Sequence, residues 1–133
     1  MHPRIRRAVP DDAARLSEIA RAAKARWGYP PEWLDAWREE LTLRPEYLAE
    51  HRVLAAEAAD GPVGVCALED HADHWRLEHA WVDPAHQGRG IGQALVREAL
   101  EIVRTIRPGK VRVVSDPHAA GFYLGLGARP AGT

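Results

Sequence analysis

The segment 81–96 constrains the fold more than any other part of the sequence, because it joins a strand, a glycine-rich loop and a helix. Its first two residues end an apolar run, and Asp-Pro follows as a turn. Gly88, Gly90 and Gly92 then occupy every second position, so a large anionic group can approach the bare backbone amides. The helix N-terminus behind such a loop offers free N–H groups and a positive dipole end. The segment therefore predicts a phosphate-binding loop and a phosphorylated ligand.

The spacing of the glycines separates several known phosphate loops. A Walker A loop needs a lysine after its last glycine, and none follows here, so that loop is excluded. A dinucleotide fingerprint has one more residue before its third glycine and lies in a first βαβ unit, whereas this loop lies two-thirds along the chain. In a plain strand-to-helix turn, three glycines would lower the helix propensity, and no gain would offset that loss. These last two interpretations remain as weaker alternatives.

Periodicity along the chain predicts a single α+β domain over residues 1–133, with a mixed sheet. Asp60-Gly61 between two β-rich runs is a hairpin signal. In chain order we expect a strand at 4–8, helices at 16–27 and 31–41, a helical turn at 45–51, strands at 52–59, 62–69 and 75–82, a helix at 90–107, a strand at 111–115, a short helix ending at 126, and a strand beginning at 128–131.

Composition excludes several classes of protein. A net charge of −1 gives no general attraction to nucleic acid or membranes, and no apolar run approaches the ~20 residues of a membrane span. The arginine-rich N-terminus lacks the apolar stretch of a signal peptide. The one cysteine, Cys66, lies in an apolar run, which favours a buried residue over a nucleophile and suits a reducing cytoplasm. We therefore expect a cytoplasmic location.

Two motifs together resemble one family. Residues 87–92, Gln-Gly-Arg-Gly-Ile-Gly, are similar to the Gln/Arg-x-x-Gly-x-Gly/Ala signature of the GNAT superfamily of N-acetyltransferases. Residues 115–123, Ser-Asp-Pro-His-Ala-Ala-Gly-Phe-Tyr, resemble that family's Asp-Pro-Asn-Ala…Phe-Tyr segment, and the element order agrees over essentially the whole chain. The resemblance implies a GNAT-like fold and transfer of acetyl from acetyl-CoA to an amine of a small molecule or peptide by direct attack.

The resemblance also implies the donor site. Backbone amides of the loop would bind the CoA pyrophosphate, and the pantetheine arm would lie where strand 75–82 diverges from strand 111–115. Arg89 adds charge to the phosphate contacts or is simply solvated, and His118 stands where asparagine is frequent. The site requires no metal. The implied CoA-binding residues are Trp81, Val82, Gln87, Gly88, Arg89, Gly90, Ile91, Gly92, Gln93, His118 and Phe122.

Acetyl transfer needs a neutral amine, a stabilised thioester oxygen and a protonated leaving thiolate. Glu78 is the candidate base. Strict alternation places it with Ala80 and Val82 on one face of its strand, opposite Leu77 and Trp81, which suit a helix-covered face. The alternative is a carboxylate paired with a cation such as its neighbour at position 76. His79 is a second candidate base, with a packing or hydrogen-bonding residue as the favoured alternative.

Tyr123 is the candidate general acid, because the resemblance aligns it with a tyrosine that sits beside the CoA sulfur. The alternative is a half-buried core tyrosine. The resemblance implies that the first two helices and their connection shape the acceptor pocket, and four aromatic residues gather there, where they form either a wall for an apolar or cationic amine or part of the core. They are Trp27, Tyr29, Trp33 and Trp37.

Other features leave alternatives open. His71 and His74 lie on a predicted exposed loop rather than one helix face, so we expect no metal site there. Relatives continue through one or two further C-terminal strands, so we expect an exposed sheet edge that a second subunit covers, or a shortened relative. The rival function is a non-catalytic acyl-CoA-binding or regulatory module. The acceptor itself is not named by the sequence.

Overall fold

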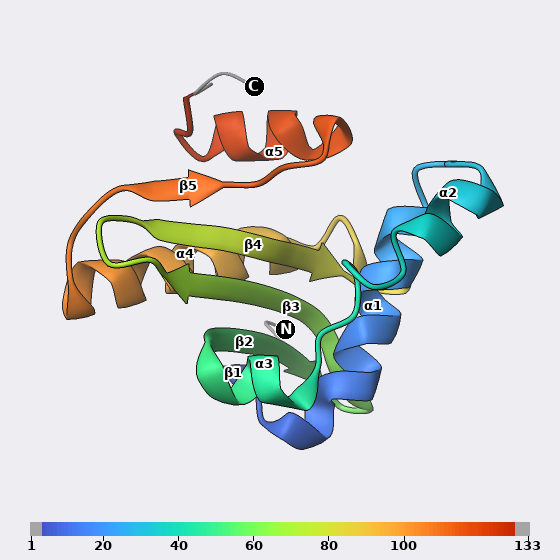
Figure 1. The fold of residues 1–133 in the computed structure, drawn as a ribbon, viewed down its shortest axis with the longest axis horizontal. Coiled ribbons are helices and arrows are strands. Elements are labelled where there is room, and N and C mark those ends of the chain that lie inside the picture. The colour runs from blue at the N-terminus through green and yellow to red at the C-terminus, as the bar shows by residue number, and fades with distance from the viewer. Residues whose placement is uncertain (1–3, 130–133) are drawn as a thin grey trace.

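The computed structural model describes residues 4–129, which form one five-stranded sheet with helices on both faces (Figure 1). The order of the elements agrees with the sequence prediction, and the fold is a mixed α+β arrangement. In chain order the elements are β1 (Arg4–Arg7), α1 (Ala13–Ala25), α2 (Pro31–Ala36), α3 (Pro45–Glu50), β2 (Arg52–Ala58), β3 (Gly61–Asp70), β4 (Trp75–Val82), α4 (Ile91–Ile106), β5 (Val111–Val113) and α5 (Ala120–Gly125).

The strands lie side by side in the order β1-β2-β3-β4-β5. The first four are antiparallel to their neighbours, and β5 runs parallel to β4. The predicted β2–β3 hairpin is present, but its two-residue turn is Ala59-Asp60, one position earlier than expected. Gly61 already pairs with Ala58 and opens β3 with a φ of +116°, which glycine adopts at low cost.

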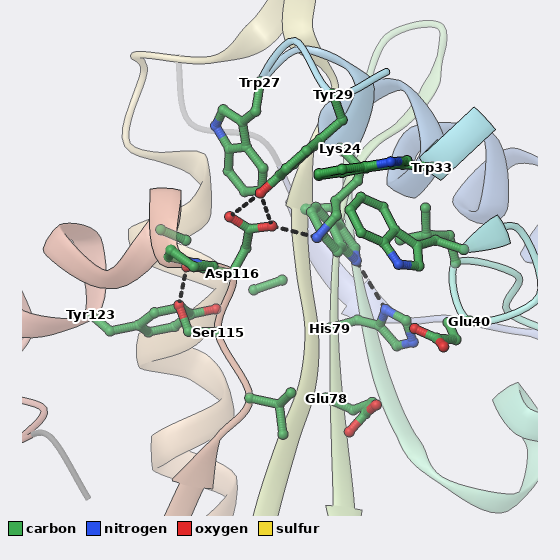
Figure 2. A pocket seen from close by; sticks show the side chains of 17 residues that line it. Lys24, Trp27, Tyr29, Trp33, Glu40, Glu78, His79, Ser115, Asp116 and Tyr123 are labelled. Carbon is green, nitrogen blue, oxygen red and sulfur yellow. Dashed lines mark hydrogen bonds and ion pairs between the residues drawn. The ribbon is translucent and has the colours of Figure 1, made fainter. Parts of the chain in front are cut away.

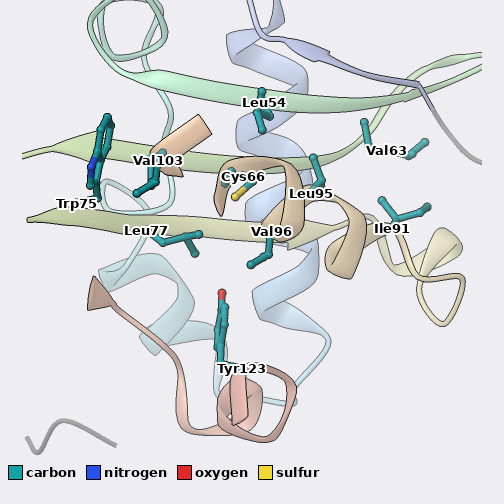
Figure 3. Packing of buried hydrophobic residues seen from close by; sticks show 13 residues of the cluster. Leu54, Val63, Cys66, Trp75, Leu77, Ile91, Leu95, Val96, Val103 and Tyr123 are labelled. Carbon is teal, nitrogen blue, oxygen red and sulfur yellow. The ribbon is translucent and has the colours of Figure 1, made fainter. Parts of the chain in front are cut away.

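The sheet separates two apolar layers. On one face Cys66 and Leu77 pack with Leu95 of α4, and α5 closes the end of this layer (Figure 3). On the other face Val65 packs with Ile19 of α1, and α3 covers the rest. Burial raises the pKa of the Cys66 thiol to about 12, so the thiol stays neutral and serves as a small core residue, as expected.

The alternation of β4 breaks at Glu78, and this corrects the predicted assignment of faces. Pairing with β3 skips from Leu77 to His79, so Glu78 has no opposite residue and forms a β-bulge. Leu77 faces the α4 layer, whereas Trp81, predicted on the same face, packs against the α1 layer. The prediction was wrong because one extra residue reverses the alternation of everything after it. The bulge leaves Glu78 and His79 lining the same cleft.

The parallel strands β4 and β5 stay paired only at one end. Pairing runs from Trp75–Val111 to Leu77–Val113, and the Val114 N–H then donates to the Leu77 carbonyl at 3.3 Å. Further along, no backbone hydrogen bond joins the two strands within the described part of the chain. The predicted divergence of these strands is thus present, and β5 is two residues shorter than expected.

Two predicted elements differ from the structure. The helix expected at 31–41 ends at Ala36, because the chain turns there to bury Leu41 and Leu43 beneath α1. The last expected strand, 128–131, falls partly outside the described residues, and positions 128–129 are not in a strand. Over residues 4–129, β5 pairs only with β4, and no helix has the length and apolarity needed to cross a bilayer.

Candidate active site

The glycine-rich loop connects the end of β4 to the first turn of α4. Gly88 and Gly90 have φ values of +78° and +77°, which L-residues rarely adopt, and Gly90 forms the N-cap of the helix. Gly92 has no such φ, and a Cβ there would lie in ordinary contact, 3.5 Å from Phe122 and from Val82. Gly88 and Gly90 therefore turn the chain sharply, and the N-terminus of α4 faces an open cleft.

That cleft, called here the donor cleft, has a volume of about 600 Å³. Its walls come from the end of β4, the glycine loop and α5. Of the predicted CoA-binding residues, ten line it: Trp81, Val82, Gln87, Gly88, Gly90, Ile91, Gly92, Gln93, His118 and Phe122. Arg89 does not, and its side chain is exposed. The Val82 carbonyl accepts a hydrogen bond from Gln87 Nε2 at 3.1 Å.

A second cleft, called here the acceptor cleft, adjoins the first and has a volume of about 470 Å³ (Figure 2). Its lining brings together the four aromatic residues predicted for the acceptor side, the bulge of β4 and the segment after β5. Five residues line both clefts: Trp27, Ala80, Trp81, Ala119 and Tyr123. The two cavities therefore meet where β4 and β5 diverge.

Glu78 lines the acceptor cleft, with 29% of its side chain exposed. Burial raises its pKa, and the charge of Arg76 opposes that rise. Arg76 Nε lies 2.7 Å from Glu78 Oε2, but the groups are not aligned as a hydrogen bond, so both atoms lack a directional partner. The ion pair weighed from the sequence is therefore present, and the role of Glu78 as a base stays a prediction.

His79 is buried beside it and is held neutral. Burial lowers its pKa to about 4. The indole N–H of Trp81 donates to His79 Nδ1 at 2.9 Å, which assigns the ring proton to Nε2. With Nδ1 occupied and Nε2 carrying a proton, the neutral ring presents a donor to the cleft and lacks a free basic nitrogen.

Tyr123 is only 8% exposed and belongs to the apolar layer under α4. Figure 3 shows its side chain rising from α5 with the hydroxyl directed toward the sheet. Burial raises the pKa of Tyr123, so the phenol keeps its proton at neutral pH. The ring therefore packs in the core, as the alternative interpretation held, and it also lines both clefts, while its role as a general acid stays a prediction.

The segment after β5 contributes a charged cluster that the sequence did not predict. Asp116 is nearly buried, forms an ion pair with Lys24 of α1 and accepts a hydrogen bond from the Tyr29 hydroxyl at 2.8 Å (Figure 2). Its second oxygen lies 2.8 Å from His118 Nδ1. Burial works against the charged form, but the hydrogen bonds outweigh it and hold the pKa of Asp116 below its ordinary value. His118 also stacks on Trp27.

Aromatic rings surround the Lys24 ammonium on its other sides. Its Nζ lies 4.7 Å from the ring centre of Trp37 and 5.2 Å from that of Tyr29. The rings of Trp27 and Trp81 follow at 5.8 and 6.0 Å. The expected aromatic wall therefore exists as a cation-binding cage, and the chain's own lysine occupies it.

The histidine-containing turn between β3 and β4 lies apart from both clefts. His71 and His74 stack on each other and pair with the neighbouring carboxylates of Glu69 and Asp73. Among residues 4–129, no group of three or more metal-ligating side chains is assembled. Neither histidine lines the donor or the acceptor cleft.

Comparison with known proteins agrees with this geometry. A family model described as an acetyltransferase (GNAT) domain matches residues 49–127. A stretch of 61 residues is 31% identical to a soybean (Glycine max) protein named histone acetyltransferase TAP1, covering 46% of this chain and 26% of that protein. The match therefore spans about a quarter of the relative's length.

Solved structures share the whole fold. The paia N-acetyltransferase of Thermoplasma acidophilum, in complex with coenzyme A, superposes with a TM-score of 0.80 at 22% identity, over 96% of this chain and 88% of that one. A GNAT family acetyltransferase of Brucella melitensis, in complex with acetyl-CoA, gives a TM-score of 0.71 at 27% identity, over 97% and 84% of the two chains.

Proposed function

The chain belongs to the GNAT acetyltransferase family, and on that premise we propose that it transfers an acetyl group from acetyl-CoA to a primary amine by direct attack. The observation that carries the proposal is the meeting of the donor and acceptor clefts at Tyr123. A thioester reaching through the gap between β4 and β5 would come within reach of an amine bound in the second cleft, and no covalent acyl-enzyme is needed.

The donor side of the proposal rests on the loop and the helix behind it. Backbone amides of residues 87–93 and the N-terminus of the 16-residue helix α4 are suited to an anionic pyrophosphate. The pantetheine arm would follow the diverging edge of β4 past Val82 and Trp81. The Val82 carbonyl accepts one hydrogen bond from Gln87 and keeps a second lone pair, so it could still take part in the polar contacts of the arm. The Arg89 side chain is exposed and does not line the cleft, so this residue would contribute through its backbone amide alone.

The chemistry assigns one step to each of two side chains. Glu78, whose pKa burial raises, would take the proton from the incoming ammonium, directly or through water. Tyr123, whose phenol stays protonated, would give its proton to the departing thiolate. His79 presents only an N–H to the cleft, so its role would be to hold the amine or a water by a hydrogen bond.

The acceptor cleft favours a cationic amine with an apolar body. Glu40 and Glu78 place two carboxylates on its wall, and the tryptophan rings supply apolar surface, with Trp33 half exposed at the mouth. A primary ammonium next to an aromatic or alkyl group satisfies both. The proposal commits to this class of acceptor.

The test is an amine screen. Acetyl-CoA is incubated with the protein and a panel of arylalkyl, alkyl and peptide amines, thiol release is followed, and acetylated products are identified by mass spectrometry. The proposal expects stoichiometric release of CoA and an N-acetyl product, fastest with cationic arylalkylamines. Tight binding of acetyl-CoA without release of CoA to any amine would refute it and would favour an acyl-CoA-binding module.

A further inference from the structure

The position of Lys24 in the acceptor cleft has a chemical consequence. Its side chain leaves α1, lies 15% exposed and ends among the residues that line the cleft. One of the four rings around its Nζ is Trp81, which also lines the donor cleft. Its ion-pair partner, Asp116, follows β5, the strand that diverges from β4. A primary alkylamine of this chain therefore lies beside the junction of the two clefts.

The lysine content of the chain makes this placement specific. Of 18 lysine and arginine residues only Lys24 and Lys110 are lysines, and an arginine guanidinium is not an acceptor for acetyl transfer. Lys110 is exposed at the start of β5, beside Trp75, whose N–H donates to its carbonyl. That end of β4 and β5 is the paired end, remote from the divergence. Of the two lysine side chains, one thus ends in the cleft and one lies outside it.

We propose that Lys24 occupies the position of the acceptor amine and that the protein acetylates this residue in cis. The inference rests on the proposed function and names its substrate class: a primary alkylamine whose cation is held between Asp116 and a cage of aromatic rings. An external acceptor competes with the lysine for the same cage.

The reaction balances without a further reactant. The Lys24 ammonium releases one proton, for which the Asp116–His118 contact offers a route to solvent because the His118 side chain is half exposed. The neutral Nζ attacks the acetyl carbonyl, forming a C–N bond while the C–S bond breaks. The second amine proton is lost and the leaving thiolate is protonated by the Tyr123 phenol, which is reprotonated in turn. The products are N-acetyl-lysine and CoA, and the amide does not pass the acetyl group on.

The experiment uses the whole chain and acetyl-CoA alone. Intact mass is followed over time, and cleavage after glutamate yields the peptide 19–32, which contains Lys24 as its only lysine. We expect the gain of one acetyl group on that peptide, about tenfold or more faster than any modification of Lys110, because positioning replaces a bimolecular encounter. The rate constant should not depend on protein concentration, since the reaction is intramolecular.

Matched variants separate enzymatic modification from spontaneous chemistry. Lys24→Arg keeps a cation in the cage and should abolish the mass gain, whereas Lys110→Arg should leave it unchanged. Tyr123→Phe should slow it as it slows transfer to an added amine. Equal modification of both lysines, or a rate that Tyr123→Phe does not alter, would overturn the proposal.

A parallel reaction with the amine panel distinguishes the two proposals. If amines are acetylated while Lys24 remains unmodified, self-acetylation is refuted and the proposed function stands. If neither Lys24 nor any amine is acetylated although acetyl-CoA binds, both are refuted. If Lys24 alone is acetylated, self-acetylation stands, and transfer to the amine classes of the panel is refuted.

Discussion

Burial shifts the pKa values of three side chains beside the clefts, in each case toward the neutral form. The phenol of Tyr123 and the imidazole of His79 are kept neutral, and the carboxyl of Glu78 has a raised pKa. Groups perturbed in this way are typical of sites where protons move. Each of the three therefore has a consequence that a single substitution can measure.

Tyr123→Phe removes only the hydroxyl and leaves the buried ring in place. We expect kcat to fall by about 10²-fold, since a positioned general acid contributes on that order, while acetyl-CoA affinity changes little. Steady-state kinetics with an arylalkylamine, together with calorimetric titration of acetyl-CoA, measure the two quantities. An unchanged kcat would remove Tyr123 from the mechanism.

Glu78→Gln removes the proposed base without changing its size. In the wild type kcat/KM should rise with pH as Glu78 loses its proton, with the midpoint above the ordinary glutamate pKa because burial raises it. In the variant this rise of kcat/KM with pH should disappear, and kcat/KM should be about 10²-fold lower than in the wild type. A variant with the wild-type pH dependence and rate would show that Glu78 serves only as the partner of Arg76.

His79 should make stability depend on pH. Its pKa is about 4 in the folded chain against an ordinary value near 6.5, so between these values the unfolded state binds a proton that the folded state does not. Stability therefore falls as pH falls through this window, by up to about 3 kcal/mol. Urea unfolding at pH 7 and pH 4.5 measures it. His79→Gln, which can still accept from Trp81, should show a smaller loss; an equal loss would contradict the assignment.

At the scale of elements, the close approach of α4 to β3 depends on Gly64. A Cβ at that position would lie 3.0 Å from Leu95 and 3.1 Å from Ile91. Gly64→Ala should therefore destabilise the fold by about 1–3 kcal/mol through overpacking. Gly90→Ala is the matched control, because a Cβ there meets no atom within 4 Å and its cost is conformational, about 1–2 kcal/mol, from the φ of +77°.

The two glycine variants differ in what they do to the donor site. Gly90→Ala should also weaken acetyl-CoA binding, because Gly90 sets the entry to α4 and lines the donor cleft. Thermal unfolding with and without acetyl-CoA separates the effects, since a ligand that binds only the folded state raises its stability according to its affinity. Gly64→Ala with wild-type stability would contradict the packing argument.

Local patterns predicted the elements that carry the donor site. β4 has the predicted bounds and α4 nearly so, because strand alternation and helical spacing are visible in a few neighbouring residues. The bulge at Glu78 was not predictable in this way, since it arises from register with β3. The Lys24–Asp116 pair joins residues 92 positions apart and depends on the tertiary fold alone. The one sequence signal for this pair is that Lys24, one of only two lysines, lies three positions before Trp27.

At the scale of the molecule, the two ends of the β4–β5 strand pair differ in structure. At one end β4 and β5 stay paired and the apolar layers are continuous; at the other they diverge and the two clefts open. Of the helices, α4 lines the donor cleft alone, α2 lines the acceptor cleft alone, and α1 and α5 contribute residues to both. Under the proposed function, this arrangement would let donor and acceptor bind at the same time.

Simultaneous binding is the central claim, and bisubstrate kinetics test it most directly. Initial rates are measured while acetyl-CoA and an accepted amine are both varied, and the reciprocal rates are plotted against the reciprocal of one substrate at fixed levels of the other. Direct attack in a ternary complex predicts lines that intersect, in agreement with the buried, neutral thiol of Cys66. Parallel lines, with an acetylated enzyme that passes its acetyl group to the amine, would contradict the account.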